Sequence, residues 1–128
     1  IRADRDKFIQ VVVNIILNAR DAMPNGDELL VTSGGITREP DHRGVAVFQF
    51  RDTGQGISET VLSHVFEPFF TTKPTGVGLG LPVCKAIIEE HGGAVSVTAH
   101  PDGNSRYRTV ISVELPLAEE RQGIDNPA

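Results

Sequence analysis

The sequence predicts an α+β fold: a two-layer sandwich in which helices pack on one face of a mainly antiparallel mixed β-sheet. A long helix pattern opens the chain, two pairs of strand patterns follow, and further helix patterns separate the first pair from the second. With 128 residues, the chain is long enough for one domain and one core. We expect the domain to cover residues 1–117 and the polar segment 118–128 to be a disordered tail.

The first half of the chain is predicted to contain one helix and two strands. The helix pattern covers 4–22, with Asp4 as its N-cap and with Pro24 and Gly26 ending it. Two strand patterns follow, within 27–36 and at 45–52, and a polar turn region at 37–44 separates them.

The second half is predicted to contain two helices and two strands. Ser58 can cap a short helix that reaches about Val65, and a loop is expected at 66–80. A longer helix pattern covers 81–91, where Pro82 is tolerated because it lies in the first turn. The strand patterns lie at 94–100 and 106–115 and are joined by the turn sequence PDGN.

Composition and charge exclude several classes of protein. The net charge is −5 and the 12 Lys and Arg residues are scattered, so a nucleic acid is not expected as a partner. No apolar run approaches the roughly 20 residues that cross a bilayer, so we expect a cytoplasmic domain without membrane contact. Cys84 is the only cysteine, which excludes an internal disulfide and a Cys-based metal cluster. Because the sequence begins at Ile1 without Met, we expect a longer parent protein, whose membrane anchoring the sequence leaves open.

A polar stripe follows the first predicted helix. At about 100° per residue, five polar side chains of an otherwise apolar segment share one narrow stripe: Lys7, Gln10, Asn14, Asn18 and Asp21. Asn is a poor residue for a helix interior, yet Asn14 and Asn18 lie there one turn apart. Two amide oxygens suit a Mg²⁺ ion that keeps its water and phosphate ligands. An ordinary solvated stripe explains the pattern equally well.

Asp52 ends the apolar face of the second strand. Side chains alternate along a strand, so Asp52 shares a face with Phe48 and Phe50, and its carboxylate is expected to point toward the core. A buried carboxylate needs a hydrogen-bond donor, which the exocyclic amine of a purine would supply. Gly54 and Gly56 would let a flat group approach the backbone. A plain Asp-Thr-Gly turn is the alternative.

Two features of the long loop indicate an anionic ligand. Three phenylalanines crowd around Pro68, and two hydroxyl residues and Lys73, a candidate phosphate contact, follow them; an exposed loop lysine is the alternative. Next, Gly76, Gly78 and Gly80 precede a helix N-terminus, where free N–H groups and the helix dipole favour an anion. The glycine spacing matches neither the P-loop nor the Rossmann fingerprint.

Together and in this order, these four stretches resemble the nucleotide-binding motifs of the superfamily of gyrase, Hsp-type chaperones, histidine kinases and MutL. The similarity is greatest to the catalytic ATP-binding domain, a Bergerat fold, of bacterial two-component sensor histidine kinases of the nitrogen-regulation and oxygen-sensing types. NIILNARDAMPNG resembles the N box, DTGQGI the G1 box, FEPFFTTK the F box, and GVGLGLPVCKAIIEEHGG the G2 box with its following helix. The resemblance covers roughly residues 4–117.

The resemblance implies a role for each motif. Asn18 would ligate Mg²⁺, with Asn14 supporting the metal and the phosphates of ATP, and Asp52 would accept a hydrogen bond from the adenine amine. Residues 67–77 would form an ATP lid hinged on Phe66 and on Phe69. Further implied nucleotide-binding residues are Asp21, Gly54, Gly56, Ile57, Thr71, Thr72, Lys73, Gly76, Val77, Gly78, Leu79, Gly80 and Leu81.

The chain departs from many such kinases after the second Asn of the N box. Asp21 and Ala22 stand where a basic residue and then an aromatic residue are common, and Arg20 lies on the other side of the helix. The resemblance therefore implies that Lys73 carries more of the contact with the phosphates.

Asn14 distinguishes branches of the superfamily. Gyrase-like and chaperone-like ATPases carry Glu there as a general base, and an amide cannot accept that proton. The resemblance thus implies transfer of the γ-phosphoryl group to a histidine on an upstream dimerisation domain, with the receiver domain of a response regulator as a further partner. None of the chain's 4 histidines stands in the H-E-hydrophobic-R-N-P setting of a phosphoacceptor. An ATP-hydrolysing conformational switch and a non-catalytic nucleotide-binding module are the alternatives.

Overall fold

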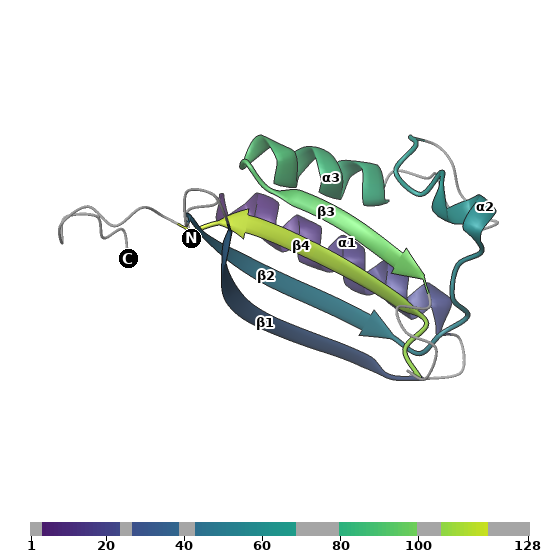
Figure 1. Cartoon of the computed structure of the whole chain (residues 1–128). Helices are drawn as coiled ribbons and strands as arrows, with labels where there is room; N and C mark the ends of the chain where they lie inside the picture. Colours follow the sequence, from purple (N-terminus) through teal and green to yellow (C-terminus); the bar gives the residue numbers. More distant parts are fainter. Residues whose placement is uncertain (1–3, 24–26, 39–42, 69–79, 100–105, 118–128) are drawn as a thin grey trace, which may run out of the picture.

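The computed structural model describes residues 4–23, 27–38, 43–68, 80–99 and 106–117. Seven elements follow one another along the chain (Figure 1). They are helix α1 (Arg5–Ala22), strands β1 (Leu29–Arg38) and β2 (Arg43–Asp52), helices α2 (Glu59–Leu62) and α3 (Gly80–Glu90), and strands β3 (Ala94–Ala99) and β4 (Thr109–Pro116).

The strands form one sheet in the order β1-β2-β4-β3. Each neighbouring pair is antiparallel, so the parallel pairing that a mixed sheet would contain is not seen among the described strands. Helices α1 and α3 lie side by side on one face of this sheet (Figure 1). The predicted α+β two-layer sandwich is confirmed.

The core fills the space between the helices and the inner face of the sheet. Along β2, Ala46, Phe50 and Asp52 are buried, as the alternation of the sequence predicts. Facing them on β4 are Leu115, Ile111 and Thr109 in the same register. The helices complete the core with Val11 and Ile15 of α1 and Leu81, Cys84, Ile87 and Ile88 of α3.

Both long helices have the ends that their sequences predict. At the start of α1, the Asp4 carboxylate accepts a hydrogen bond from the Lys7 main-chain N–H at 3.1 Å. At the end of α3, Gly92 takes a positive φ of 81° and its N–H donates to the Glu89 oxygen. The Gly93 N–H donates to the Ile88 oxygen, which completes a Schellman motif.

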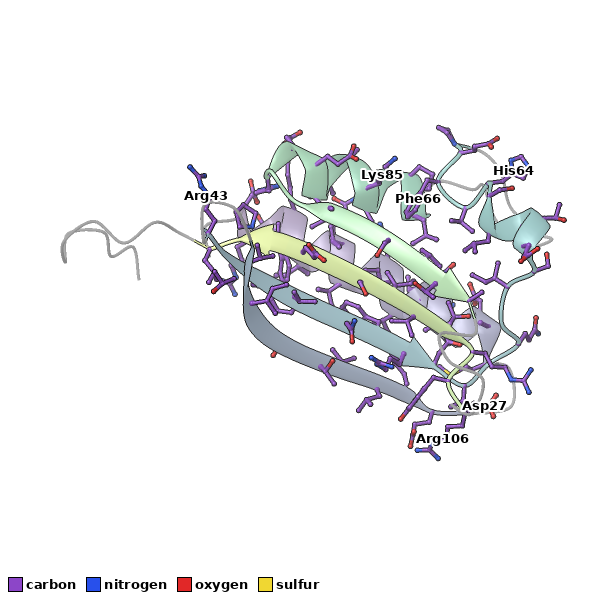
Figure 2. All side chains as sticks on the ribbon, viewed as in Figure 1. Asp27, Arg43, His64, Phe66, Lys85 and Arg106 are labelled. Atoms are coloured by element: carbon purple, nitrogen blue, oxygen red, sulfur yellow. The ribbon has the colours of Figure 1, made fainter. Side chains whose placement is uncertain are left out.

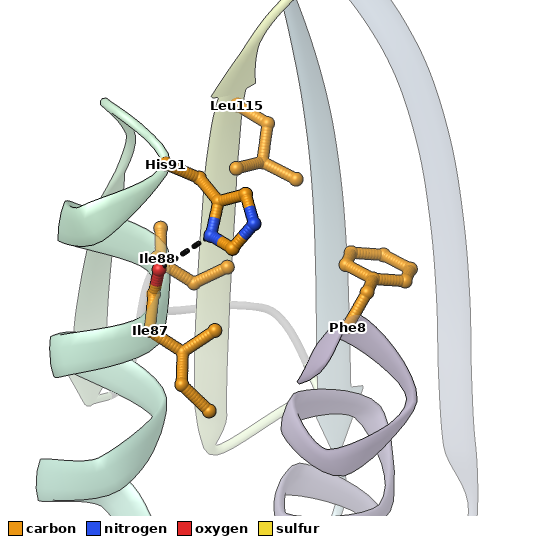
Figure 3. A pocket seen from close by; sticks show the side chains of 5 residues that line it. All are labelled: Phe8, Ile87, Ile88, His91 and Leu115. Carbon is orange, nitrogen blue, oxygen red and sulfur yellow. Dashed lines mark hydrogen bonds between the residues drawn. The ribbon is translucent and has the colours of Figure 1, made fainter. Parts of the chain in front are cut away.

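The end of α3 is joined to the start of α1 through His91. Its Nδ1 is 2.8 Å from the Ile87 main-chain oxygen (Figure 3), and its Nε2 accepts a hydrogen bond from the Asp4 main-chain N–H at 3.1 Å. An apolar gap lined by Phe8, Ile87, Ile88, His91 and Leu115 lies beside it and has no room for a water molecule. This end of the helix pair is therefore closed by packing.

Several predicted boundaries shift. The first hairpin is longer than predicted, because Thr37 pairs with Gly44 and Arg38 with Arg43, so the predicted turn region at 37–44 is partly strand. Conversely, α2 ends at Leu62 rather than at about Val65, with Ser63 as its C-cap. Strand β4 begins at Thr109, three residues later than the sequence pattern predicts. The PDGN turn lies outside the described residues.

Candidate functional site

Asp52 is the buried carboxylate of the sheet. Its side chain lies at the end of β2 and only 4% of the residue's surface is exposed. The Gly54 main-chain N–H donates a hydrogen bond to Oδ1 at 3.0 Å. Burial raises the pKa of Asp52, the Gly54 hydrogen bond partly opposes this, and the negative charge of Asp27 adds to the rise. The predicted inward orientation of this carboxylate is confirmed.

Thr109 is a second buried polar residue at this position. It stands directly opposite Asp52 in the pairing of β2 with β4, and 3% of its surface is exposed. Opposite residues of an antiparallel pair share one face, so a hydroxyl and a carboxylate end the same apolar surface. Thr109 was not predicted from the sequence. Alternation along β4 could have revealed it, because Thr109 shares its face with the buried Ile111, Val113 and Leu115.

The turn after Asp52 rests on the C-terminal end of α1. The Gln55 main-chain N–H donates to the Ala22 oxygen at 3.0 Å. A Cβ atom added at Gly54 would lie 2.2 Å from that same oxygen, so no larger residue fits without a shift of the backbone. Gly56 has a φ of 79°, a region that disfavours side chains. These glycines place Asp52 beside the last turn of α1.

The two N-box asparagines lie one turn apart on α1, and both are half-buried. Next to them, the thiol of Cys84 on α3 donates a hydrogen bond to the Val11 main-chain oxygen of α1, with Sγ 3.6 Å from that oxygen. Burial raises the pKa of the Cys84 thiol to about 11, against the opposing effect of Asn14. Asp21 lies almost one turn after Asn18 and is exposed. Its carboxylate Oδ1 is 3.4 Å from Nη2 of the Arg20 guanidinium. Asn14 and Asn18 thus lie along α1 toward the end of this helix that contacts the turn after Asp52.

The start of α3 and the segments beside α2 carry further predicted site residues. Gly80 is the exposed first residue of α3, and Leu81 is buried in the core. Phe66 is half-buried, and the Lys85 ammonium lies 5.3 Å from its ring centre (Figure 2). Ile57 is half-buried in the loop between Asp52 and α2. The predicted hinge residue Phe66 is therefore held against α3 by a cation–π contact.

The remaining predicted residues lie outside the described part of the chain. They are Phe69, Thr71, Thr72, Lys73, Gly76, Val77, Gly78 and Leu79. The lid assignment and the phosphate contact of Lys73 therefore stay predictions.

The described side chains fit one kind of Mg²⁺ site, in which nucleotide phosphates supply most of the ligands. No group of three or more His, Cys, Asp or Glu residues gathers among them to hold a metal ion. A magnesium ion carried by nucleotide phosphates needs only one or two protein oxygens, and the amide of Asn14 or Asn18 can supply such an oxygen. In the same part of the chain, no helix is long and apolar enough to span a membrane.

Comparison with known protein families identifies the family of this chain. Residues 3–119 match the family described as histidine kinase-, DNA gyrase B-, and HSP90-like ATPase. The chain belongs to this ATPase family. Its relatives include the sensory histidine kinase/phosphatase NtrB of Azospirillum brasilense, with 36% identity over 98% of this chain and 32% of that protein. The chain spans between 14% and 32% of the length of its curated relatives.

Solved structures of this ATPase family have the same fold. The mycobacterial sensor histidine kinase MprB matches with a TM-score of 0.75 and 32% identity, over 89% of this chain and 72% of that one. Full-length ShkA in complex with AMPPNP matches with a TM-score of 0.71 and 28% identity, over 92% of this chain and 23% of that one. The family match and the likeness to MprB, a sensor histidine kinase, confirm the family resemblance of the sequence motifs.

Proposed function

We propose that the chain binds Mg-ATP and catalyses transfer of the γ-phosphoryl group to a histidine on an upstream dimerisation domain of its parent protein. The observation that carries this proposal is Asp52, a carboxylate 4% exposed at the end of an apolar strand face, with Thr109 opposite it. The carboxylate can accept a hydrogen bond from the edge of a buried base, and the hydroxyl can donate or accept one. AMPPNP, an ATP analogue, is bound in the related ShkA.

Each motif has a distinct part in this function. Asp52 would accept a hydrogen bond from the adenine amine and so favour ATP over GTP. Asn18, supported by Asn14, would offer an oxygen to Mg²⁺ at the phosphates, which lowers the repulsion felt by an attacking nucleophile. The free N–H groups at the start of α3 would bind phosphate oxygens. Lys73 and the segment 67–77 would close over the nucleotide.

The proposed phosphoryl transfer uses the acceptor histidine as the nucleophile. A nitrogen of the acceptor histidine attacks the γ-phosphorus, a P–N bond forms, the bond to the β-phosphate oxygen breaks, and ADP leaves. The imidazole nitrogen brings its own lone pair, so the reaction needs no carboxylate base at position 14. Asn14 therefore favours a kinase over the ATP-hydrolysing switch, and the relatives named as sensor kinases support the same choice. We further propose the nitrogen-regulation subtype and a response regulator as the next partner.

Calorimetric titration with ATP, with and without Mg²⁺ and with GTP as a control, tests this proposal. Selective binding of ATP that strengthens with Mg²⁺ is expected. Equal affinity for GTP would remove Asp52 from base recognition. Steady hydrolysis by the chain alone would favour the conformational switch, and absence of nucleotide binding would favour a non-catalytic module.

Asn18→Ala should remove most of the gain in ATP affinity that Mg²⁺ brings, because the metal loses a protein ligand. Titration of the variant with ATP in magnesium and in EDTA measures this gain. Gln10→Ala is the matched control, since Gln10 is an exposed amide two turns earlier on the same helix and should bind like the wild type. If Asn18→Ala keeps the gain in ATP affinity that Mg²⁺ brings, other residues hold the metal.

A further inference from the structure

Asp52 stands in the last row of the sheet. In the pairing of the strands, Leu29 of β1 lies opposite Asp52 on one side and Thr109 of β4 on the other. One residue beyond this row, the Thr53 main-chain N–H donates a hydrogen bond to the Glu28 main-chain oxygen at 3.1 Å. The Thr53 hydroxyl in turn accepts one from the Glu28 main-chain N–H at 2.9 Å. Strands β1 and β2 therefore stay joined past their last pair.

The Glu28 side chain reaches the segment that leads into β4. Its Oε1 accepts a hydrogen bond from the Tyr107 hydroxyl at 3.0 Å and pairs with the guanidinium of Arg106, which is labelled in Figure 2. The same guanidinium lies over the Tyr107 ring, 5.5 Å from its centre. Strands β1 and β4 both flank β2 and so lie roughly 10 Å apart. These three side chains thus form a bridge across the end of β2.

The bridge is attached to both residues that are proposed to contact the base. On the β2 side, Thr53 directly follows Asp52 in the sequence. On the β4 side, Tyr107 precedes Thr109 by two residues, and the Arg108 main-chain N–H between them donates to the Asp52 main-chain oxygen at 2.8 Å. A shift of this segment relative to β2 would therefore change the spacing between the Asp52 carboxylate and the Thr109 hydroxyl.

We propose that Glu28 is a positioning residue of the base site. Through Tyr107 and Arg106 it holds the segment before β4 against the end of β2, and this fixes Thr109 relative to Asp52. The inference rests on the proposed function and deepens it by assigning base selectivity to a group that does not touch the base. A carboxylate and a hydroxyl at a fixed spacing discriminate between bases better than a pair whose spacing varies.

An ordinary surface ion pair is the competing explanation. The side chains of Glu28 and Arg106 are 48% and 68% exposed, and exposed ion pairs add little to stability. The chain offers a matched control in Lys7 and Glu90, an ion pair that is 46% and 61% exposed and lies where α1 begins and α3 ends. Loss of either pair would cost similar stability, whereas only loss of the bridge should change the selectivity for the base.

The first measurement is made without nucleotide. Tyr107 is the only tyrosine of a chain without tryptophan, so tyrosine emission reports on the bridge alone. Because a carboxylate acceptor quenches tyrosine emission, Glu28→Ala should raise the emission and Glu90→Ala should leave it unchanged. Exchange of the Gly54 N–H, which donates to Asp52, should become about three- to fivefold faster in Glu28→Ala. Unchanged emission or unchanged exchange in this variant would overturn the inference.

Two controls accompany the exchange measurement. Glu28→Gln keeps an oxygen that can accept from the Tyr107 hydroxyl, so its Gly54 N–H should exchange nearly as slowly as in the wild type. The Gly93 N–H, which donates to the Ile88 oxygen at the end of α3, should exchange at the wild-type rate in Glu28→Ala. Equal acceleration at Gly54 and Gly93 would mean a loss of overall stability and would contradict a positioning role.

The second measurement is calorimetric titration with ATP and with GTP in magnesium. Glu28→Ala should weaken ATP binding about three- to fivefold, the worth of about one net hydrogen bond, with little change for GTP. Glu28→Gln should restore most of the selectivity, and Glu90→Ala should bind like the wild type. Tyr107→Phe keeps the ring and loses the hydroxyl, so it should lower the selectivity too. Combined with Glu28→Ala, it should cost less than the sum of the two single losses.

The outcomes separate this inference from the proposed function. Equal losses for ATP and GTP in Glu28→Ala, or additive losses in the double variant, would assign the bridge to stability alone and overturn the inference. If the wild-type chain binds no Mg-ATP, the proposed function fails. The emission of Tyr107 and the exchange of the Gly54 N–H still decide in that case whether Glu28 positions the turn that carries Asp52.

Discussion

The burial of Asp52 opposes stability at neutral pH. Its pKa is raised, chiefly by burial, above the value of 3.8 for a free aspartate, so the folded state favours the protonated form. The favourable contribution of this group to folding is therefore complete below its unfolded pKa and is lost as the pH rises through the folded pKa. At neutral pH the protein keeps a buried charge, and among the described residues a hydrogen bond from the Gly54 main-chain N–H compensates it in part. A cost of this kind is typical of binding residues.

Asp52→Asn should accordingly raise the thermal midpoint at pH 7 while weakening ATP binding about 10- to 100-fold, because a charge-assisted hydrogen bond to the base is lost. The gain in stability should shrink as the pH falls through the raised pKa of the folded aspartate and vanish below the unfolded value of 3.8, because the aspartate of the wild type is then protonated. Thermal melts at pH 7 and pH 4 and titration with ATP measure both effects. Asp27→Asn, which removes only the nearby repulsion, should shift stability in the same direction by less. A wild type as stable as Asp52→Asn at pH 7 contradicts this account.

Prediction from sequence succeeded for Asp52 because alternation within one strand determines which face a residue occupies. Alternation along β4 alone would show that Thr109 is buried, but its position opposite Asp52 depends on the register between two strands that are more than fifty residues apart in the sequence. The contact between the Cys84 thiol and the Val11 main-chain oxygen was missed for the same reason, because it depends on how two separate helices pack.

At the scale of elements, Gly54 lies at the contact between the turn after β2 and the C-terminal end of α1. The sequence suggests that the glycine leaves room for a ligand, but the structure gives a nearer reason: the Ala22 main-chain oxygen occupies the space of a side chain. Contact between a turn and the end of a distant helix cannot be read from a local sequence pattern. The element order was predictable, whereas the exact boundaries depend on such contacts and on cross-strand pairing of polar residues such as Thr37.

Gly54→Ala should destabilise the protein by about 1–3 kcal/mol, as expected when a methyl group is forced into a packed contact. It should also weaken ATP binding, because the turn that donates to Asp52 must move. Urea denaturation and calorimetry measure the two effects. Gly34→Ala is the matched control: a methyl group there meets no atom within 4 Å, so its stability should stay within about 0.5 kcal/mol of the wild type. Equal stability of the two variants would show that the turn adapts.

At the scale of the whole molecule, the two ends of the helix layer differ. Where α3 ends and α1 begins, His91 accepts a hydrogen bond from the Asp4 main-chain N–H. At the same end, the Lys7 ammonium forms an ion pair with the Glu90 carboxylate, with Nζ 2.9 Å from Oε1. Toward the other end lie the start of α3, Phe66 and the Asp52 turn on the last turn of α1. Of the four predicted motifs, the described parts lie toward this second end, while residues 69–79 lie outside the described part of the chain. The closed end joins α1 to α3, and the opposite end carries the described residues proposed to bind the nucleotide.

This asymmetry bears on whether the chain can phosphorylate itself. His91 has hydrogen-bond contacts at both ring nitrogens at the closed end, so neither of them is available to attack a phosphate. The Nδ1 atom of His64, labelled in Figure 2, pairs with Glu67 in the segment after α2. Incubation of the chain with Mg-ATP should therefore yield no phosphohistidine by intact-mass measurement. Adding the upstream dimerisation domain proposed for the parent protein should yield phosphohistidine on that domain alone, and Asp52→Asn should reduce its rate. An alkali-stable, acid-labile phosphoryl group on this chain itself would mean that one of its own histidines reaches the nucleotide.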